Sequence, residues 1–478
     1  TSQIDILARR LKKEGKKAYG YLDALEEQVN KIGTTVSDVI QKEHFDIALR
    51  RVSMGNSIRS LKEMNRINFL EIFEKINGVE EILKKDPANV YEFMDYKTKE
   101  YYRNQIKEIA KKSKISEMYI AKKVIDLAEK AKKDREEKVF ATSQNNTGKE
   151  KKAHIGYYLI DEGKETLYQV LGVKKHIIKQ NTKVKWYISC IYMISFFISL
   201  FSGIYTYEKT NGIFAILMFL FTFIPVSEII LQIVQQILNK TIKPKLIPKM
   251  DFYNGIEKEN ATMVVIPTII NSKEKLQDLF GKLEVYYLAN QTENLYFTLL
   301  GDCTSEDQKT VKKDEEIINL GKELAKELNK KYEDRFFPKF HFLYRTRKWN
   351  EGEGSYLGWE RKRGLLNQFN RYILEKKPSD FIVNTIEDYG EEIPKIKYVI
   401  TLDADTDLVL NSAFELVGAM AHILNKPVLD KEKNIVVEGH ALIQPKVGID
   451  LIASRKTLFT KIFAGSGGTD LYTNAISD

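Results

Sequence analysis

Three carboxylates stand at alternate positions at the end of the segment Tyr398-Val-Ile-Thr-Leu-Asp403-Ala-Asp405-Thr-Asp407. The apolar run before them predicts a buried strand, which would deliver Asp403 and Asp405 to the edge of a sheet. Carboxylate oxygens at this spacing suit a hard divalent cation, Mg²⁺ or Mn²⁺. In open α/β sheets, ligands bind outside the carboxyl ends of the strands. The pattern therefore indicates a metal site of the kind that neutralises a diphosphate leaving group.

Two simpler interpretations compete with a catalytic metal site. A solvated turn that binds nothing is common for any isolated Asp-x-Asp. A calcium loop of the D-x-D-x-D kind requires Gly at its sixth position and Glu at its twelfth, where this chain has Leu408 and Phe414. The calcium loop is excluded, and the preceding strand favours a ligand over a solvated turn, because buried strands rarely end in three acids without a partner charge.

Two earlier predicted strands also end in residues that we expect to bind a nucleotide diphosphate. Pro267 and Thr268 follow the strand expected at Met263 to Ile266, and Asp302 follows the strand expected at Leu295 to Leu300. A carboxylate at the position of Asp302 is suited to accept hydrogen bonds from a uracil or a ribose. Alternatively, it caps the helix that follows.

A stretch rich in aromatic and basic residues lies between these strands and the acidic segment: Trp349-Asn-Glu-Gly-Glu-Gly-Ser-Tyr356-Leu-Gly-Trp359-Glu-Arg-Lys362-Arg363-Gly364. Lys362 and Arg363 are suited to phosphate oxygens, and Gly364 permits close backbone approach. The aromatic rings are suited to stack on sugars. The alternatives are a solvated basic face and aromatic residues that belong to the core. The glycine spacing matches no dinucleotide fingerprint, and the sequence contains no P-loop.

The elements that must position these residues alternate between strands and helices from about residue 250. Strands are expected at Met263–Ile266, Leu295–Leu300, Phe340–Tyr344 and Tyr398–Leu402, with a candidate fifth at Ile435–Gln444. Helices are expected at Lys273–Leu288 and Ser305–Lys331. This alternation predicts an α/β fold with a mostly parallel sheet covered on both faces.

Three regions follow from the patterning: a helical region at 1–184, an apolar hairpin at 185–240 and the α/β domain at 250–478. Trp186 to Tyr207 is uncharged and long enough to cross a bilayer, and Gly212 to Val226 is apolar again. We expect a transmembrane hairpin; a hairpin buried in a large soluble core is the alternative.

Lysines flank the predicted hairpin on both sides. They are Lys174, Lys175, Lys179, Lys183 and Lys185 before it, and Lys240, Lys243, Lys245 and Lys249 after it. The connecting turn holds only Lys209. The positive-inside rule therefore places both flanks, and the α/β domain, in the cytoplasm.

Composition narrows the class of protein. The chain has 478 residues, 43% of them hydrophobic, and a formal net charge of +9. The lysines are scattered among glutamates rather than gathered into a basic block, so nucleic acid is not an expected partner. Two cysteines, Cys190 and Cys303, give no disulfide framework or zinc site, which favours a reducing compartment.

Several dispersed motifs together resemble cyclic β-1,2-glucan synthases. In the α/β half they are Leu246-Ile-Pro-Lys-Met-Asp-Phe, Met263-Val-Val-Ile-Pro-Thr, Leu299-Leu-Gly-Asp302, Gly358-Trp-Glu-Arg-Lys-Arg-Gly364, Asp403-Ala-Asp-Thr and Gly467-Gly468-Thr-Asp470. In the helical half they are Asn56-Ser-Ile-Arg-Ser-Leu61, the region from Asp86-Pro87 through Arg103, and His154-Ile-Gly-Tyr-Tyr-Leu-Ile-Asp161. The resemblance covers most of the chain.

The resemblance implies a bacterial inner-membrane, multi-pass protein with a processive, inverting glycosyltransferase module of GT-A fold. Such a module uses UDP-glucose to extend a β-1,2-glucan acceptor, among membrane lipid and the remaining modules of a longer chain. By position, Asp302 lies near the uridine, and Lys362, Arg363 and Gly364 form the diphosphate side. Asp403 and Asp405 form the Asp-x-Asp, with Asp405 as the direct ligand of Mg²⁺ or Mn²⁺.

An inverting transferase also needs a general base for the acceptor hydroxyl. After Asp450 the only acidic residues are Asp470 and Asp478, and neither stands in the expected context. We therefore expect the base beyond residue 478, an α/β domain that is incomplete at its C-terminus, and a fragment that binds the donor without polymerising it. Two alternatives stay open: a GT-A transferase of different linkage, and a non-catalytic, membrane-anchored assembly module.

Overall fold

The computed structural model describes residues 2–66, 77–141, 150–173, 180–241, 246–332, 338–375, 381–392, 395–430, 432–445, 448 and 450–463. The chain divides into two compact units, Thr1–Glu81 and Ile82–Asp478. This boundary falls inside the range 1–184, which the sequence groups as one helical region.

The first unit is helical, with α1 (Ser2–Lys13), α2 (Tyr19–Asn30) and α3 (Val36–Arg66). Its small core consists of buried Val29 and Val36, against which Leu25, Val39 and Ile40 pack. Asp38 and Thr35 exchange hydrogen bonds and close the start of α3. These interactions are typical of a capped amphipathic helix.

The second unit begins with a helical part and continues into the apolar hairpin. The helical part contains α6 (Tyr96–Ser113), α7 (Glu117–Ala141), α9 (Ile155–Ile160) and α10 (Lys164–Val170), while α5 (Gly78–Leu83) spans the boundary between the units. The hairpin consists of α11 (Gln180–Tyr207) and α12 (Gly212–Thr241), which pack against each other.

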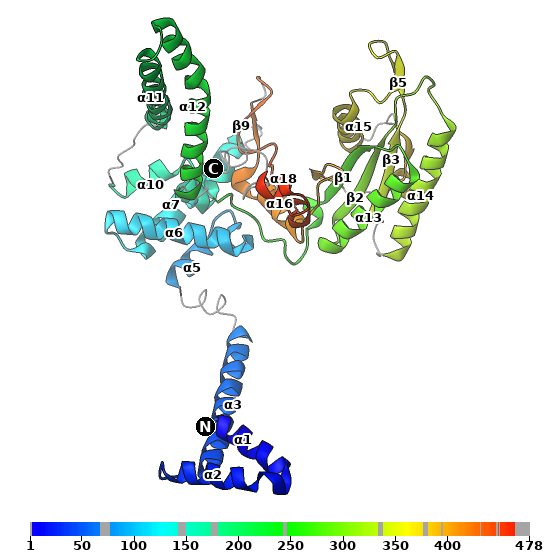
Figure 1. Cartoon of the computed structure of the whole chain (residues 1–478). Coiled ribbons are helices and arrows are strands. Elements are labelled where there is room, and N and C mark those ends of the chain that lie inside the picture. The colour runs from blue at the N-terminus through cyan, green and yellow to red at the C-terminus, as the bar shows by residue number, and fades with distance from the viewer. Residues whose placement is uncertain are drawn as a thin grey trace. The chain divides into compact units, whose positions relative to one another are not determined.

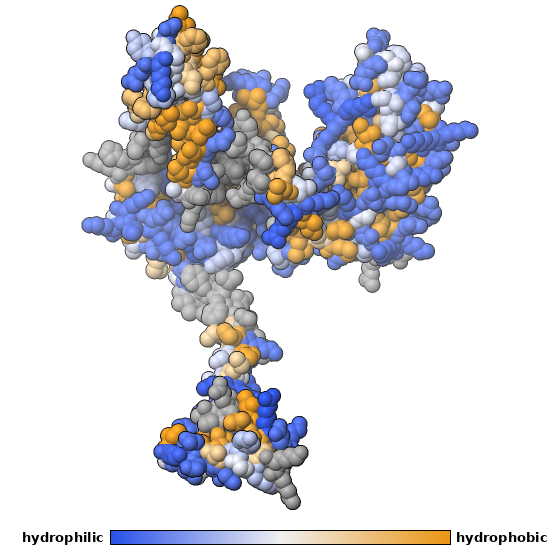
Figure 2. All heavy atoms as spheres, viewed as in Figure 1, coloured by the Kyte–Doolittle hydropathy of each residue, from blue (hydrophilic) through white to orange (hydrophobic). Residues whose placement is uncertain are grey.

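The hairpin carries much exposed apolar surface. Lys185–Tyr207 and Gly212–Leu238 are long and apolar enough to cross a membrane, and only 22% and 6% of their most apolar windows are buried. Figure 2 shows the hydrophobic side chains gathered over these helices. A helix buried in a soluble core would hide such side chains, so this exposure argues against the soluble alternative.

The α/β region is built on a five-stranded sheet with the order β6-β3-β2-β1-β7 (Figure 1). The strands are β1 (Thr262–Ile269), β2 (Leu295–Asp302), β3 (Phe340–Arg345), β6 (Phe381–Asn384) and β7 (Tyr398–Thr401). All neighbouring pairs are parallel except β3 and β6. The predicted α/β class and mostly parallel sheet are confirmed.

Helices cover both faces of the sheet. The helices α13 (Lys273–Ala289), α14 (Lys312–Lys331) and α16 (Ser412–Ala421) share one apolar core with side chains such as Val264 and Phe297. The helix α15 (Arg361–Glu375) packs on the other face, against side chains such as Val265 and Leu300. Successive strand residues therefore enter opposite cores, as the pleat requires.

Two strand predictions differ from the structure. The strand β7 is not buried on both faces: it lies at the sheet edge, where Val399 and Thr401 are exposed. The candidate fifth strand is confirmed only over β9 (Ile435–Glu438), which pairs with β8 (Val428–Asp430) in a separate two-stranded hairpin and does not join the main sheet. A short hairpin, β4 (Lys348–Asn350) with β5 (Ser355–Leu357), was not predicted.

The segment Lys249–Asp251 joins the helical part to the α/β region. The amide of Asp251 donates to the carbonyl of Phe93, and the amide of Asp95 donates to the carbonyl of Lys249. On the other side, the amide of Met250 donates to the carbonyl of Gly418 in α16. The segment is therefore hydrogen-bonded on both sides, and we call it the joining segment.

A buried polar cluster reinforces this junction. Asp86 contacts His154 at 2.7 Å, and His154 also contacts the hydroxyl of Tyr102 at 3.0 Å. Burial by itself raises the pKa of Asp86, but the charge and hydrogen bond of His154 outweigh burial and lower it. The ring of His422, which follows α16, lies 5.4 Å from that of His154. These satisfied polar groups favour one docking geometry over others.

We predict that Gly418→Ala destabilises the second unit. A Cβ at Gly418 would overlap the carbonyl of Met250, and relieving that overlap would cost about 1–3 kcal/mol. Thermal unfolding of the detergent-solubilised chain measures the effect. Gly281→Ala is the matched control, since a Cβ there meets no atom within 4 Å and alanine favours a helix by up to about 1 kcal/mol. Equal midpoints for the two variants would contradict the prediction.

Candidate functional site

Candidate site residues from three adjacent strands lie together at the carboxyl-terminal ends of these strands. In the register of β1 and β2, Ile269 lies opposite Asp302, and in that of β1 and β7, Val265 lies opposite Thr401. Pro267, Thr268, Asp302 and the acidic segment after β7 therefore lie at the same edge. The chain continues from β1 to β2 on one side, whereas β7 pairs with β1 on the other side, so the strand order reverses at β1. The carboxyl end of β1 is therefore a switch point, the usual ligand position in open α/β sheets.

The helix α13 fixes the acidic segment after β7, residues 402–408, which we call the carboxylate loop. Lys282 donates to the carbonyl of Ala404 at 2.7 Å, and the hydroxyl of Tyr286 donates to the carbonyl of Thr406 at 2.7 Å. Leu402 and Leu408 are buried at the two ends of the loop. Because these contacts hold the backbone, Asp403 and Asp405 are left exposed to solvent.

Lys362 lies against the carboxylate loop. Its ammonium donates to Oδ1 of Asp403, and both side chains are about half exposed, 48% and 58%. The pair joins residues 41 positions apart in the sequence. The predicted cation and the predicted metal ligand therefore meet at the switch point, as expected if both face one anionic ligand.

Asp302 is engaged inside the protein rather than presented to solvent. Arg345 donates to both of its oxygens, from Nε at 2.7 Å and from Nη2 at 2.6 Å, and both side chains are almost fully buried. The amide of Cys303 also donates to Oδ1 of Asp302. A nucleotide would have to displace Arg345 to reach this carboxylate. The capping alternative is wrong, because α14 begins at Lys312 and Asp314 serves its first turn.

Arg345 also holds the segment Gly358–Lys362, which we call the cationic turn. Its Nη1 donates to the carbonyl of Trp359 and its Nη2 to the carbonyl of Arg361, each at 2.8 Å. A Cβ at Gly358 would overlap Asp302 and Arg345, so only glycine fits there. The buried ion pair thus fixes the backbone that presents Lys362.

Two residues of the predicted diphosphate motif do not face the carboxylate loop. Arg363 pairs with Glu360 and its side chain is 82% exposed, which matches the alternative of a solvated face. Gly364 lies against the carbonyl of Trp359, where a Cβ would overlap it. The close approach that Gly364 permits is to the protein's own backbone.

The predicted aromatic residues are partly available. Trp349 and Trp359 are about half exposed, and the rings of Trp349 and Tyr356 meet edge to face at 5.1 Å. The backbone of Tyr356 exchanges two hydrogen bonds with Glu306, which ties the β4–β5 hairpin to the chain after β2. These rings lie near the end of β2 rather than in either core.

The chemistry of the donors fits a hard cation only in part. The exposed oxygens of Asp403 and Asp405 are of the type that Mg²⁺ and Mn²⁺ prefer. Within the described residues, no group of three or more His, Cys, Asp or Glu side chains gathers as a metal cage. Mg²⁺ is usually held by one or two carboxylates together with substrate phosphates and water, so the pair fits a cation that arrives with its ligand.

Cys303 lies beside Asp302 but is not a nucleophile. Burial, with a smaller contribution from the charge of Asp302, raises the pKa of its thiol to about 11. The thiolate is the reactive form, so this cysteine stays protonated and inert at neutral pH.

Sequence reasoning missed Arg345 and Arg361. Arg345 ends β3 just as Asp302 ends β2, so a charge at the end of a buried strand was an available signal. The hydrogen bond from Arg361 to Ser305 had no such signal, because it depends on the conformation of the cationic turn.

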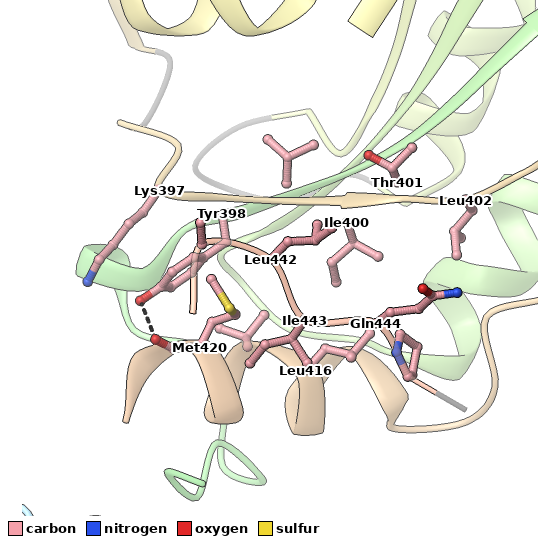
Figure 3. A pocket seen from close by; sticks show the side chains of 14 residues that line it. Lys397, Tyr398, Ile400, Thr401, Leu402, Leu416, Met420, Leu442, Ile443 and Gln444 are labelled. Atoms are coloured by element: carbon pink, nitrogen blue, oxygen red, sulfur yellow. Dashed lines mark hydrogen bonds between the residues drawn. The ribbon is translucent and has the colours of Figure 1, made fainter. Parts of the chain in front are cut away.

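One mainly apolar cavity lies between β7 and α16. It has a volume of about 490 Å³ and is lined by β7, by α16 and by residues 441–445 (Figure 3). Ile400, Leu416 and Leu442 contribute to its walls. It holds none of the predicted site residues.

The fold and the site define an α/β protein with a doubly wound, mostly parallel sheet, acidic and basic groups at its switch point, and an apolar helical hairpin. The chain is 27% identical over 477 residues to the cyclic beta-(1,2)-glucan synthase NdvB of Rhizobium meliloti (strain 1021). The match covers 98% of this chain and 16% of the length of that relative. No family model matches the chain. The relative confirms the resemblance that the motifs indicate.

We predict that Arg345→Met and Asp302→Leu, made singly, each destabilise the second unit by about 3–5 kcal/mol, because each leaves an uncompensated buried charge. The double variant should lose much less than the sum, since it removes both charges. Thermal or urea unfolding measures the three costs.

Glu360→Gln is the control, because its pair with Arg363 is exposed and exposed pairs contribute about 0–1 kcal/mol. Strictly additive costs for the two buried residues would show that they do not act as a pair.

Proposed function

We propose that this chain is the donor-binding part of a membrane-bound, inverting glucosyltransferase that elongates β-1,2-glucan from UDP-glucose. The observation that carries the proposal is the meeting of Lys362 with Asp403, beside Asp405, at the switch point of the sheet. The name of the relative supports glucan as the product class.

In this proposal different residues of the site contact different parts of the donor. Lys362 leaves Asp403 to neutralise phosphate oxygens, and Thr268 and Pro267 line the end of β1 beneath the nucleotide. Asp302 acts through Arg345 by holding the cationic turn in place. Glucose transfer is then an in-line displacement at the anomeric carbon by an acceptor hydroxyl, with UDP as the leaving group.

Asp405, with Asp403, is the proposed holder of Mg²⁺ or Mn²⁺, which would stabilise negative charge on the departing UDP. The acceptor is the growing glucan. None of the residues that the structure describes is assigned as the general base.

We further propose that α11 and α12 cross the bacterial inner membrane as part of a multi-pass protein. Their exposed apolar side chains need a lipid environment, and the flanking lysines favour a cytoplasmic α/β region. The remaining modules of the longer protein are then partners of this chain within the same polypeptide.

We predict that the chain binds UDP in the presence of Mn²⁺ and that Asp405→Ala weakens this binding at least tenfold, because a metal ligand is lost. Isothermal titration calorimetry on the detergent-solubilised chain measures both affinities. Asp407→Asn is the matched control, since Asp407 already accepts from Tyr286 and is not assigned to the metal. No heat with the intact chain would favour the assembly-module alternative.

A second experiment tests the linkage. The full-length protein, supplied with radiolabelled UDP-glucose, should form labelled glucan that a β-1,2-specific glucanase digests. Labelled product that resists this enzyme would show a transferase of different linkage.

A further inference from the structure

Two consecutive residues of the cationic turn have an unusual backbone conformation. Glu360 and Arg361 have φ angles of 48° and 47°, in the left-handed region that non-glycine residues rarely adopt. Such conformations are strained and persist only where the surrounding structure holds them in place.

The surroundings do over-determine this turn. Arg345 holds the carbonyls on both sides of Glu360, those of Trp359 and Arg361. The amide of Gly364 donates to the carbonyl of Glu360, and the amide of Arg361 donates to that of Gly358. The strain is therefore maintained by a buried ion pair, and its effect is to set the direction of the Arg361 side chain.

The guanidinium of Arg361 is only partly satisfied. Its Nη2 donates to the hydroxyl of Ser305 and lies 3.8 Å from Glu353. Its Nη1 is buried and has no hydrogen-bond partner among the described residues. An unpaired buried donor is costly, so this nitrogen favours an acceptor that the described residues do not supply.

Arg361 and Lys362 contact segments that follow two different strands. Ser305, the partner of Arg361, follows β2, whereas Asp403, the partner of Lys362, follows β7. These two strands flank β1 and are separated by about 10 Å, twice the spacing of neighbouring strands. The two cations therefore contact the segments that follow the two neighbours of β1.

We propose that Arg361, rather than Arg363, is the second cation that binds the diphosphate of the donor. Guanidinium groups bind phosphate oxygens through two parallel hydrogen bonds, and Nη1 has no hydrogen-bond partner among the described residues. This assignment rests on the proposed function, because it takes the donor to be a nucleoside diphosphate sugar.

Arg361→Gln should weaken UDP binding at least tenfold in calorimetry with Mn²⁺, whereas Arg363→Gln should leave the affinity within twofold of the intact chain. Each variant removes one positive charge, at positions two residues apart, so the comparison separates a specific contact from a change in net charge. Matching thermal midpoints establish that the Arg361→Gln chain is folded.

Chemical protection of the intact chain gives an answer that does not depend on the folding of a variant. Phenylglyoxal modifies accessible arginines, and peptide mass spectrometry reports modification at each residue. UDP with Mn²⁺ should slow modification of Arg361 severalfold and leave that of Arg363 unchanged.

The outcomes separate the two proposals. If the intact chain binds no UDP, the proposed function fails and this assignment fails with it. If the intact chain binds UDP but Arg361→Gln behaves like Arg363→Gln, or UDP protects neither arginine, the assignment to Arg361 is overturned and the proposed function stands.

Discussion

The candidate site depends on the buried ion pair between Asp302 and Arg345. Such a pair gains little net stability, because removing two charges from water offsets most of their attraction. Its value lies in geometry: one guanidinium joins the ends of β2 and β3 to two carbonyls of the cationic turn. A hydrophobic pair of equal volume has no donors for those carbonyls, and the turn would then have no reason to keep its left-handed residues.

The two sides of the site are fixed independently. The carboxylate loop is held from α13 through the carbonyls of Ala404 and Thr406, and the cationic turn is held from β3 through Arg345. Neither set of hydrogen bonds uses the side chains that face the switch point. Asp403, Asp405 and Lys362 therefore remain exposed and exchangeable, which suits groups that must alternate between each other and a charged ligand.

The positions of the strands can be predicted from the sequence, whereas most side-chain contacts of the candidate site cannot. The runs of β-branched and apolar residues locate β1, β2, β3 and β7, and the polar residues after them follow because parallel strands end at one edge. The partner of Asp302 lies 43 residues further along the chain, and its sequence signal is that Arg345, like Asp302, ends a buried strand. The proposal that Arg361 binds phosphate in place of Arg363 depends on the left-handed backbone of Glu360 and Arg361. Neither residue type predicts that conformation from the sequence.

The misplaced strand has a related cause. Residues 435–438 have the composition of a strand, but composition alone does not predict the strand with which they pair. Likewise, the boundary between Glu81 and Ile82 depends on which helices contact one another, and helical periodicity alone does not report those contacts.

The joining segment has a consequence for how such chains can vary. Lys249–Asp251 is hydrogen-bonded to the start of the helical part on one side and to α16 on the other, so its register cannot slide. Differences in the length or tilt of the hairpin must then be absorbed before residue 249. Under the proposed membrane topology, a change in bilayer thickness would be accommodated on the hairpin side of the joining segment, while α16 and the carboxylate loop ahead of it keep their places.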